Sequence, residues 1–527
     1  MIYEGSMTAR EPIQVVDLFA GPGGLGEGFS SFKNGSRFKI VVSAEMDPAA
    51  RSTLKLRAFF RQLVNYNPEC LSDYYAFCDG TSPIPYSERS LEQWDAADQE
   101  ARCITLGTPA GDSELDKYLD SQLDSSKPWV LIGGPPCQAY SIVGRARNKG
   151  KVDYSPESDH RHFLYREYLR IIRERKPAIF VMENVKGILS SKVGGERIFP
   201  KILQDLADPD TALGFPNSGR KYRIFSFVSD KSYSSEFELT GIDFNEFVIK
   251  PEKFGIPQTR HRVILLGLAV DNGKQAPAIQ KLVPTAPVTV HDVIGDLPKI
   301  RSRLSKGTDR DDLWAREVLD QFDYLASQMR NVEHHKLALE LNIARRNFSK
   351  DLSTGQLRLR KVESETCLHG DLRRWFVDDR LKNVLHHDAR GHMPMDLRRY
   401  LYAAVFSNAY GYSPKGHQDF GLPGLAPNHK NWETGKFSDR FRVQIKNIPA
   451  STVTSHISKD GHYFIHYDPT QCRSLTVREA ARLQTFPDNY FFMGNRTEQF
   501  HQVGNAVPPL LAYKMADIVS GLIFSRV

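Results

Sequence analysis

A cysteine held in a proline-rich turn is the residue best suited to covalent chemistry. Cys137 stands in Gly134-Pro135-Pro136-Cys137-Gln138, directly after the apolar run 129–133 that predicts a buried strand. Buried structural cysteines lie mostly within strands or helices as small hydrophobes, whereas a thiol at a loop or a helix start gains thiolate character. The surroundings of Cys137 therefore favour a nucleophile over a structural thiol.

A glycine-rich loop near the start of the chain is the second candidate. The predicted strand Gln14 to Phe19 runs into Ala20-Gly21-Pro22-Gly23-Gly24-Leu25-Gly26, and we expect a helix to follow. Glycines permit a tight turn and a close approach of backbone amides to a ligand. The loop lacks the Lys-Ser/Thr pair of a phosphate-cradling loop, which disfavours triphosphate binding. From the loop alone, a site for a nucleotide-like ligand and a plain turn are both open interpretations.

Acidic residues at strand ends could complete such a site. Glu45 follows the predicted strand Lys39 to Ser43, and a carboxylate there can accept hydrogen bonds from ribose hydroxyls. Asp17 either faces a cationic group of the ligand or braces the loop. No clean acidic strand end occurs between residues 66 and 123, so Asp79 is only a guess for the residue beside an adenine ring.

The elements that must position these residues alternate between strand and helix. Six short apolar runs predict strands, at 14–19, 39–43, 129–133, 178–183, 223–228 and 262–267. Helical spacing of apolar residues between Arg161 and Lys176 separates two of them, and Pro177 ends that segment. The rhythm predicts an α/β fold, an open sheet with helices on both faces and ligands beyond the carboxyl ends of its strands.

The rhythm is lost between about residues 284 and 449, where basic clusters alternate with aromatics and Gly/Pro-rich loops. We interpret 284–449 as a second, smaller domain, within which Asp396 to Asn408 predicts an amphipathic helix and Arg398 and Arg399 are possible phosphate contacts. Thr476 and Glu479 predict a capping box at the start of a helix that ends before Pro487. The catalytic domain is thus expected to comprise 1–283 and 450–527.

Composition excludes several classes of protein. The chain has 527 residues, of which 40% are hydrophobic and 25% charged, and a net charge of +7, values typical of a globular protein that need not bind a polyanion. Its start lacks a secretory signal, and we expect no apolar run with the length of a bilayer span and no membrane association. The six cysteines form no CxxC pair, and His386, His387 and His392 lack a completing ligand, so we expect no metal.

Six motifs in order are similar to those of the cytosine-5 DNA methyltransferase family. They lie at 19–24 (Phe-Ala-Gly-Pro-Gly-Gly), 134–138 (Gly-Pro-Pro-Cys-Gln), 183–185 (Glu-Asn-Val), 258–262 (Gln-Thr-Arg-His-Arg), 478–487 (Arg-Glu-Ala-Ala-Arg-Leu-Gln-Thr-Phe-Pro) and 504–509 (Gly-Asn-Ala-Val-Pro-Pro). The resemblance spans nearly the whole chain. It implies a Rossmann-like sheet that binds S-adenosylmethionine, and a target recognition domain at 284–449.

The resemblance also implies roles for individual residues. Cys137 would add to carbon 6 of cytosine, Glu183 would protonate or hydrogen-bond ring nitrogen 3, and Arg262 would hold the carbonyl oxygen. Arg478 and Glu479 are expected to organise the fold. The residues expected at the cofactor are Asp17, Phe19, Ala20, Gly21, Gly23, Gly24, Leu25, Glu45, Met46, Pro135, Asn505 and Ala506. Asn505 has a turn and helix cap as its alternative role, ahead of a helix expected to pack beside the first strand.

The resemblance implies double-stranded DNA as partner, and this chemistry then implies that the base is flipped out, because carbon 6 of a stacked cytosine is out of reach of a thiol. Gln138, Ser141 and Arg260 are predicted DNA contacts, Arg260 with a structural role as its alternative. We expect a monomer in the cytoplasm and nucleoid of a bacterium, working beside a restriction endonuclease or other defence proteins. A transfer-RNA cytosine methyltransferase and a catalytically silent DNA-binding protein are the alternatives.

Overall fold

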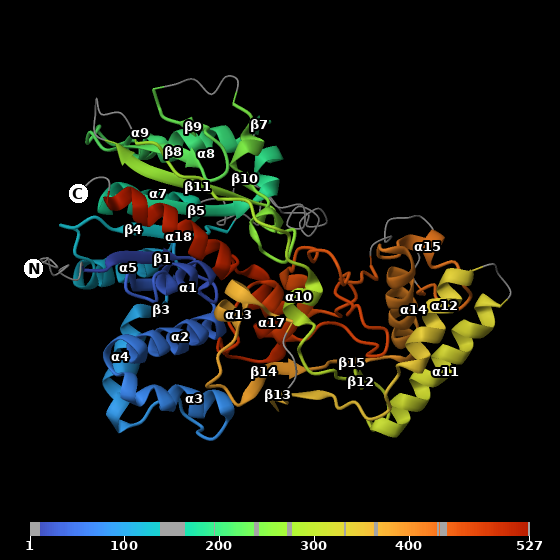
Figure 1. The fold of residues 1–527 in the computed structure, drawn as a ribbon. Helices are drawn as coiled ribbons and strands as arrows, with labels where there is room; N and C mark the ends of the chain where they lie inside the picture. Colours follow the sequence, from blue (N-terminus) through green and yellow to red (C-terminus); the bar gives the residue numbers. More distant parts are fainter. Residues whose placement is uncertain are drawn as a thin grey trace, which may run out of the picture.

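The computed structural model describes most of the chain as two lobes (Figure 1). The described residues are 11–136, 164–193, 195–236, 242–270, 277–330, 334–362, 367–428, 432 and 440–524. Cys137, Gln138 and Ser141 lie outside them.

A nine-stranded sheet forms the larger lobe, in the order β3-β2-β1-β4-β5-β11-β8-β9, with β10 paired to β11. The strands β3, β2, β1, β4 and β5 run parallel, whereas β11 is antiparallel to both β5 and β8. Its strands are β1 (Ile13–Leu18), β2 (Phe38–Glu45), β3 (Ala101–Cys103), β4 (Val130–Gly133), β5 (Ile179–Val185), β8 (Lys221–Ser226), β9 (Ser232–Tyr233), β10 (Val248–Ile249) and β11 (Arg262–Val270). All six predicted strands are confirmed, and the predicted α/β class with them.

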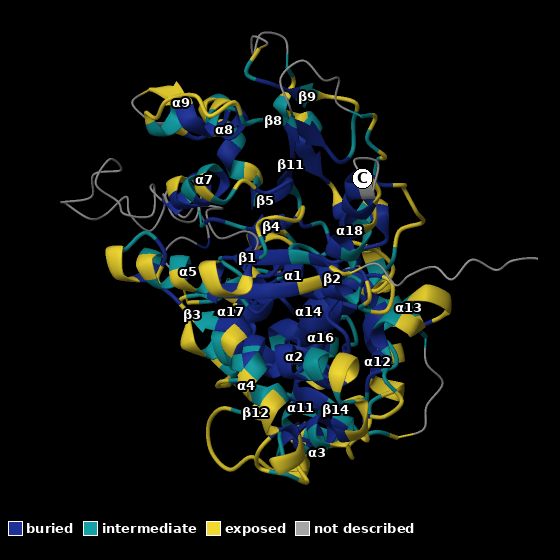
Figure 2. Cartoon of the chain, turned by 90° about the vertical axis from the view of Figure 1, so that its left-hand side faces the viewer, coloured by how far each residue is buried: buried dark blue, intermediate teal, exposed yellow. Residues whose placement is uncertain are grey.

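Helices cover both faces of this sheet, which explains the near-continuous apolar runs of its strands β4 and β11. On one face, α1 (Gly24–Ser31) and α18 (Pro509–Phe524) pack on β1 and β4. On the other lie α5 (Pro109–Gln122), α7 (Leu164–Arg175) and α8 (Ile198–Ala207). Figure 2 shows the strands as a buried layer between them. The helix expected beside the first strand is therefore confirmed as α18.

One helical stretch corrects an expectation drawn from composition. Arg496–Ile523, which joins α17 (Arg496–Asn505) to α18, is long and apolar enough to cross a bilayer, although we expected no such run. Within the molecule 72% of its apolar window is buried. Contact with α1 and the sheet accounts for that burial, as expected of a core helix.

Three helices between β2 and β3 form a layer at the edge of the sheet. They are α2 (Pro48–Tyr66), α3 (Leu71–Asp79) and α4 (Leu91–Glu100). Asp47 caps α2 by accepting a hydrogen bond from Ala50 N at 2.8 Å. Asp79, our guess for the adenine side, ends α3 instead of a strand, and its carboxylate accepts from the backbone of Lys382 and Asn383. These bonds give Asp79 a structural role, and its contact with an adenine ring stays a prediction.

The smaller lobe has its own core, built on α11 (Asp311–Met329), α12 (His335–Arg346) and α14 (Pro394–Tyr410). The predicted amphipathic helix is confirmed as α14, which buries Leu397, Tyr400 and Leu401. This core also includes Ile465 and Cys472, which lie beyond the predicted limit at 449. The domain limits 284–449 stay a prediction.

Shorter helices and strands complete the two lobes and the region between them. The helices are α9 (Pro209–Leu213), α10 (Val290–Ile294), α13 (Gly370–Phe376), α15 (Gly416–Asp419) and α16 (Val477–Leu483); the strands are β6 (Lys192–Val193), β7 (Glu196–Arg197), β12 (Arg303–Leu304), β13 (Gly355–Arg360), β14 (Asn383–Asp388) and β15 (Gly391–His392).

The predicted capping box of α16 is confirmed, because Thr476 Oγ1 accepts from Glu479 N and the Glu479 side chain accepts from Thr476 N. Arg478 donates to the carbonyls of Leu385, Pro487 and Tyr490. Glu479 forms an ion pair with Arg473 at 2.6 Å. Both residues therefore organise the fold, as predicted.

The histidines that might have suggested a metal have other partners. His387 Nδ1 lies 3.0 Å from Thr476 Oγ1 and its Nε2 lies 2.8 Å from Pro298 O. His386 Nε2 accepts a hydrogen bond from Phe492 N. Across the part of the chain that the structure describes, no group of histidine, cysteine and carboxylate side chains could hold a metal ion.

Candidate active site

Two predicted catalytic residues meet on neighbouring strands. Arg262 begins β11 opposite Val185, and Glu183 lies two residues earlier on the antiparallel β5. Arg262 Nε is 2.9 Å from Glu183 Oε1, and both side chains are largely buried. Burial lowers the pKa of Arg262, and the Glu183 carboxylate opposes that shift. The sheet thus fixes a carboxylate and a guanidinium side by side where β5 ends and β11 begins.

The described part of the cysteine loop runs toward this pair. A side chain at Gly134 would place its Cβ 3.1 Å from Glu183 Oε2, so the loop passes directly beside the carboxylate. Pro135, a predicted cofactor contact, is buried there. Cys137 follows two residues later, outside the described residues, and its role stays a prediction.

Glu45 holds the glycine loop from the end of the neighbouring strand. Its Oε2 accepts from Gly21 N at 2.8 Å, and its Oε1 accepts from Asp47 N at 2.9 Å. Burial raises the pKa of Glu45, against these backbone hydrogen bonds. Each carboxylate oxygen has a second lone pair, so Glu45 can order the loop and still accept from a ribose hydroxyl.

The glycines of the loop serve two different purposes. Gly21 has φ +57° and open space on its side-chain face, where no heavy atom lies within 4 Å of the position that a Cβ would occupy. At Gly24, by contrast, a Cβ would lie 2.1 Å from Val507 O. Gly21 therefore suits the close approach of a ligand, whereas Gly24 permits close packing with the chain that leads into α18.

Asp17 is a buried carboxyl group at the end of β1. It is 1% exposed, and neither oxygen makes a hydrogen bond with the residues that the structure describes. Burial raises the pKa of Asp17 to about 8. A cationic ligand group would satisfy such a carboxyl, and the ammonium and sulfonium groups of S-adenosylmethionine are of that type.

Met46 and Cys103 extend the candidate cofactor site along the strand ends. Met46 is 60% exposed directly after Glu45, which leaves an apolar side chain open to a ring. Cys103 ends β3 opposite Glu45, and Ile104 N donates to Glu45 O at 3.0 Å. Sequence reasoning missed β3, because a strand of three residues shows no periodicity. The residues at these strand ends fit the predicted donor.

Arg260 has a structural role rather than the predicted contact with DNA. Its side chain is 4% exposed, and Nη1 donates to Val453 O at 2.7 Å and to Gly504 O at 3.0 Å. Burial, with the nearby charge of Arg262, lowers its pKa. A guanidinium enclosed in this way supports the alternative that the sequence left open.

Two glutamines join three of the sequence motifs. Gln258 Nε2 donates to Leu483 O at 2.8 Å and to the side chain of Gln484, and Gln484 in turn donates to Ala506 O. Val453 N donates to Gln258 Oε1 at 3.1 Å. This chain of hydrogen bonds positions the segment that precedes Arg262. Sequence reasoning did not find it, because its members are far apart in the chain.

Asn505 ends α17 and is exposed, while Ala506 beside it is buried. Their contact with the cofactor stays a prediction, as it does for Phe19, Ala20, Gly23 and Leu25.

The arginines of the segment 284–449 divide into structural and exposed groups. Arg398 Nε donates to Gln321 Oε1 at 2.6 Å, and Arg399 Nε donates to Leu425 O at 2.8 Å. These two were possible phosphate contacts, and their present bonds hold the lobe together instead. Arg360 on β13 is exposed, as are Arg373 and Arg374 on α13, which form surface ion pairs with Asp379 and Asp371. These three arginines are candidates for contact with a polyanion.

Comparisons with known proteins agree with the geometry. The family model for C-5 cytosine-specific DNA methylase matches residues 107–210 and 231–520. The chain is 34% identical over 530 residues to the type II methyltransferase M.Bpa9945I of Bacillus paralicheniformis, covering 96% of this chain and 99% of that relative. It is 26% identical over 545 residues to the DNA (cytosine-5-)-methyltransferase M.ApeKI of Aeropyrum pernix, covering 96% and 97%.

Among solved structures, a candidate DNA modification methyltransferase encoded within a prophage (E. coli) has the same fold. It aligns with a TM-score of 0.50 at 18% identity, covering 97% of this chain and 99% of that chain. The extent of the family match and the 34% identity to a relative over nearly the full length are decisive. The chain belongs to the C-5 cytosine-specific DNA methylases.

Proposed function

We propose that this protein transfers a methyl group from S-adenosylmethionine to carbon 5 of cytosine in a specific duplex DNA sequence. The observation that carries the proposal is the Glu183–Arg262 pair at 2.9 Å, with Gly134, three residues before Cys137, beside it. The full-length similarity to M.Bpa9945I, a type II methyltransferase, supports a role in a restriction-modification system. The protein would act as a monomer in the bacterial cytoplasm and nucleoid, with a cognate restriction endonuclease or other defence proteins as partners.

Covalent catalysis explains why a thiol is needed beside a carboxyl and a guanidinium. Carbon 5 of cytosine is a poor nucleophile until another group adds at carbon 6. In this proposal the Cys137 thiolate bonds to carbon 6, and the displaced electron pair moves into the ring toward nitrogen 3. Glu183 donates a proton or hydrogen bond at nitrogen 3, and Arg262 donates to the carbonyl oxygen.

The later steps restore the aromatic ring. Bound S-adenosylmethionine would supply the methyl group as an electrophile: carbon 5 would bond to it while the bond between methyl and sulfur breaks and S-adenosylhomocysteine leaves. Any proton that Glu183 gave to nitrogen 3 returns to Glu183 as the ring electrons move back to carbon 5. The proton on carbon 5 then passes to a base, for which water is a candidate. The electron pair of the broken carbon–hydrogen bond re-forms the double bond between carbons 5 and 6. At the same time the bond between carbon 6 and sulfur breaks, and Cys137 leaves as thiolate.

The cofactor would lie against the carboxyl ends of β1 and β2. Gly21 offers open space, Glu45 a carboxylate for the ribose, Asp17 an unpartnered carboxyl for a cationic group, and Met46 an exposed apolar side chain. Pro135, Asn505 and Ala506 would complete the site from the other motifs.

DNA must present the cytosine as a flipped base, at a cost of roughly a few kcal/mol. The smaller lobe would offset part of this cost through contacts with phosphates and with groove edges. Arg360 on β13 and Arg373 and Arg374 on α13 are exposed and suit the contacts with phosphates.

Transfer of radiolabelled methyl groups tests the proposal. The protein is incubated with labelled S-adenosylmethionine and with duplex DNA or transfer RNA, beside the variant Cys137→Ser. We expect label on DNA with the native protein and none with the variant. Undiminished transfer by Cys137→Ser would contradict the nucleophile, label on transfer RNA alone would make RNA the substrate, and no label on diverse DNA would indicate a silent DNA-binding protein.

A further inference from the structure

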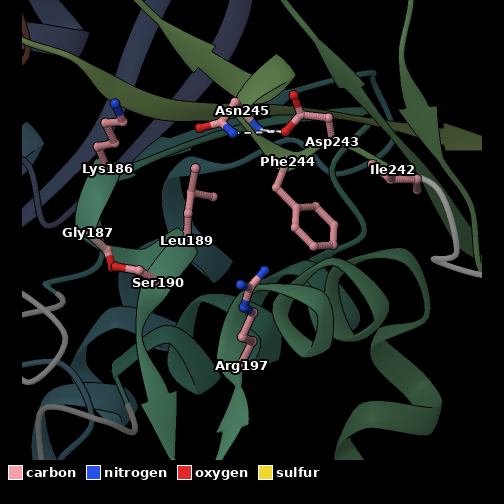
Figure 3. A pocket seen from close by; sticks show the side chains of 9 residues that line it. All are labelled: Lys186, Gly187, Leu189, Ser190, Arg197, Ile242, Asp243, Phe244 and Asn245. Atoms are coloured by element: carbon pink, nitrogen blue, oxygen red, sulfur yellow. Dashed lines mark hydrogen bonds between the residues drawn. The ribbon is translucent and has the colours of Figure 1, made fainter.

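A cavity of about 540 Å³ lies in the larger lobe (Figure 3). Three segments form its walls: η5 (Lys186–Ser190), β7, and the stretch 242–245 at the start of η6 (Phe244–Phe247). The residues that line it are Lys186, Gly187, Leu189, Ser190, Arg197, Ile242, Asp243, Phe244 and Asn245. None of them has a role in the chemistry proposed above.

The cavity lies next to the strands that carry the catalytic pair. The segment η5 follows directly on β5, so Lys186 is three residues beyond Glu183. The segment η6 leads into β10, whose Ile249 pairs with Arg262 on β11. Two walls of the cavity therefore continue from the backbone on either side of the Glu183–Arg262 pair.

Two cations line the cavity without a carboxylate of their own. Within the described ranges, neither Lys186 nor Arg197 forms an ion pair or a side-chain hydrogen bond, and both are exposed. In Figure 3 the Arg197 guanidinium points into the space below Phe244 and Leu189. Cations that fold stability does not engage are free to bind an anion such as a phosphate.

An aromatic ring and an oriented amide complete the lining. Phe244 stands over the same space, held edge to face by Phe199 at a centroid distance of 5.2 Å. Asp243 Oδ1 accepts from Asn245 N at 3.0 Å and from Asn245 Nδ2 at 2.9 Å. The amide nitrogen of Asn245 is thereby engaged, which leaves its carbonyl oxygen to accept from a base.

We propose that this cavity receives a nucleotide of the substrate DNA that neighbours the target cytosine. Lys186 and Arg197 bind its phosphate, Phe244 contacts the base, and Asn245 accepts from the base edge. The inference rests on the proposed function, because DNA that delivers cytosine to Glu183 would pass the end of β5, where η5 begins. Cation, ring and amide together match a nucleotide better than a purely anionic or purely apolar ligand.

DNA affinity as a function of salt tests the phosphate contacts without requiring methyl transfer. A fluorescent duplex of mixed sequence is titrated with native protein, Lys186→Ala, Arg197→Ala and the control Lys201→Ala, which removes an exposed charge on α8 outside the cavity. Each cavity variant should bind roughly threefold to tenfold more weakly, with a salt slope smaller by about one. Lys201→Ala should match the native slope, and all four proteins should bind S-adenosylhomocysteine equally and unfold at the same temperature.

If the salt slopes of DNA binding are equal for all four proteins while methyl transfer is intact, the role proposed for the cavity is overturned and the proposed function stands. Absence of methyl transfer, with the slope difference present, would overturn the proposed function alone.

Abasic sites test the contact with the base. Once the methylated sequence is known, duplexes that lack one base at each position flanking the cytosine are compared on native protein and Phe244→Leu. We expect one position at which base removal weakens native binding by about fivefold or more, and at which Phe244→Leu is insensitive. Equal sensitivity of the two proteins at every position would contradict the proposal, as would tight binding of a free mononucleotide that leaves DNA affinity unchanged.

Discussion

Asp17 and Glu45 are carboxyl groups at adjacent strand ends, and they differ in what satisfies them. Glu45 accepts from two backbone amides, while both oxygens of Asp17 are buried without a hydrogen bond among the described residues. An unpartnered buried carboxyl is costly when ionised, which is why the pKa of Asp17 lies near 8. Glu45 therefore orders the loop, whereas Asp17 is available to a cation.

Cofactor affinity should depend on pH through Asp17. Below about pH 8 the carboxyl holds a proton that binding of an ammonium group must displace, so affinity should rise with pH by at most about tenfold per unit and level off above pH 8. Calorimetry with S-adenosylhomocysteine from about pH 6 upward measures this. Asp17→Asn should lose the dependence. A flat native profile would show that Asp17 only braces the loop.

The charges of Glu183 and Arg262 stabilise each other, because the two side chains are largely buried side by side. Glu183→Gln keeps the size of the side chain and removes the acid. Since general acid catalysis contributes about 10²–10⁴-fold, the methylation rate should fall by at least about 100-fold with little change in S-adenosylhomocysteine affinity. Single-turnover methylation assays measure the rate. A native rate in Glu183→Gln would remove this residue from the chemistry.

At the scale of elements, the loop between β1 and α1 is shaped by two different contacts. Its Gly21 side faces open space, and its Gly24 side faces the backbone of Val507, more than 480 residues later in the chain. The C-terminal motif therefore closes on the N-terminal loop through close backbone packing.

Substitution of the two glycines separates these contacts. Gly24→Ala should lower the free energy of unfolding by about 1–3 kcal/mol, because its Cβ would overlap Val507 O. Gly21→Ala should cost about 1 kcal/mol through its positive φ and should mainly weaken binding of S-adenosylhomocysteine. Urea unfolding and calorimetry give both quantities. A greater loss of stability in Gly21→Ala than in Gly24→Ala would contradict the assignment of Gly24 to packing and Gly21 to ligand binding.

The chain of hydrogen bonds from Gln258 through Gln484 to Ala506 should stabilise the fold. Gln484→Ala leaves buried polar groups without partners, which should cost about 1–3 kcal/mol of unfolding free energy. Gln122→Ala, on the exposed end of α5, is the control and should stay within about 0.5 kcal/mol of native. Equal unfolding curves for the two variants would contradict this.

The sequence predicts those parts of the fold that local pattern determines. The strand that became β4 is a continuous apolar run because both its faces are covered, and the capping box of α16 is local by nature. The three residues of β3 carry no period, and the buried donors of Arg260 find their acceptors in segments about 190 and 240 residues away. Glu183 and Arg262 were named from family resemblance alone, and their pairing was not predicted, since no spacing rule joins positions so far apart.

At the scale of the molecule, the two lobes are fastened together through α3. Arg358 on β13 donates to Cys78 O at 2.8 Å and to Phe77 O at 3.0 Å, while Asp79 accepts from the backbone of Asn383 on β14. The β13–β14 hairpin is thereby bound to the helical layer beside the sheet. In the proposed function, this arrangement would let contacts made by the smaller lobe set the position of DNA relative to Glu183.

The identity of the methylated nucleoside tests the central claim most directly. DNA from a bacterial host that expresses the protein is digested and analysed by mass spectrometry, and the same DNA is sequenced for modified positions. We predict 5-methyldeoxycytidine confined to one short sequence, and none in cells that express Cys137→Ser. Methylation at an exocyclic nitrogen of cytosine or adenine, or 5-methyldeoxycytidine at undiminished level with Cys137→Ser, would contradict it.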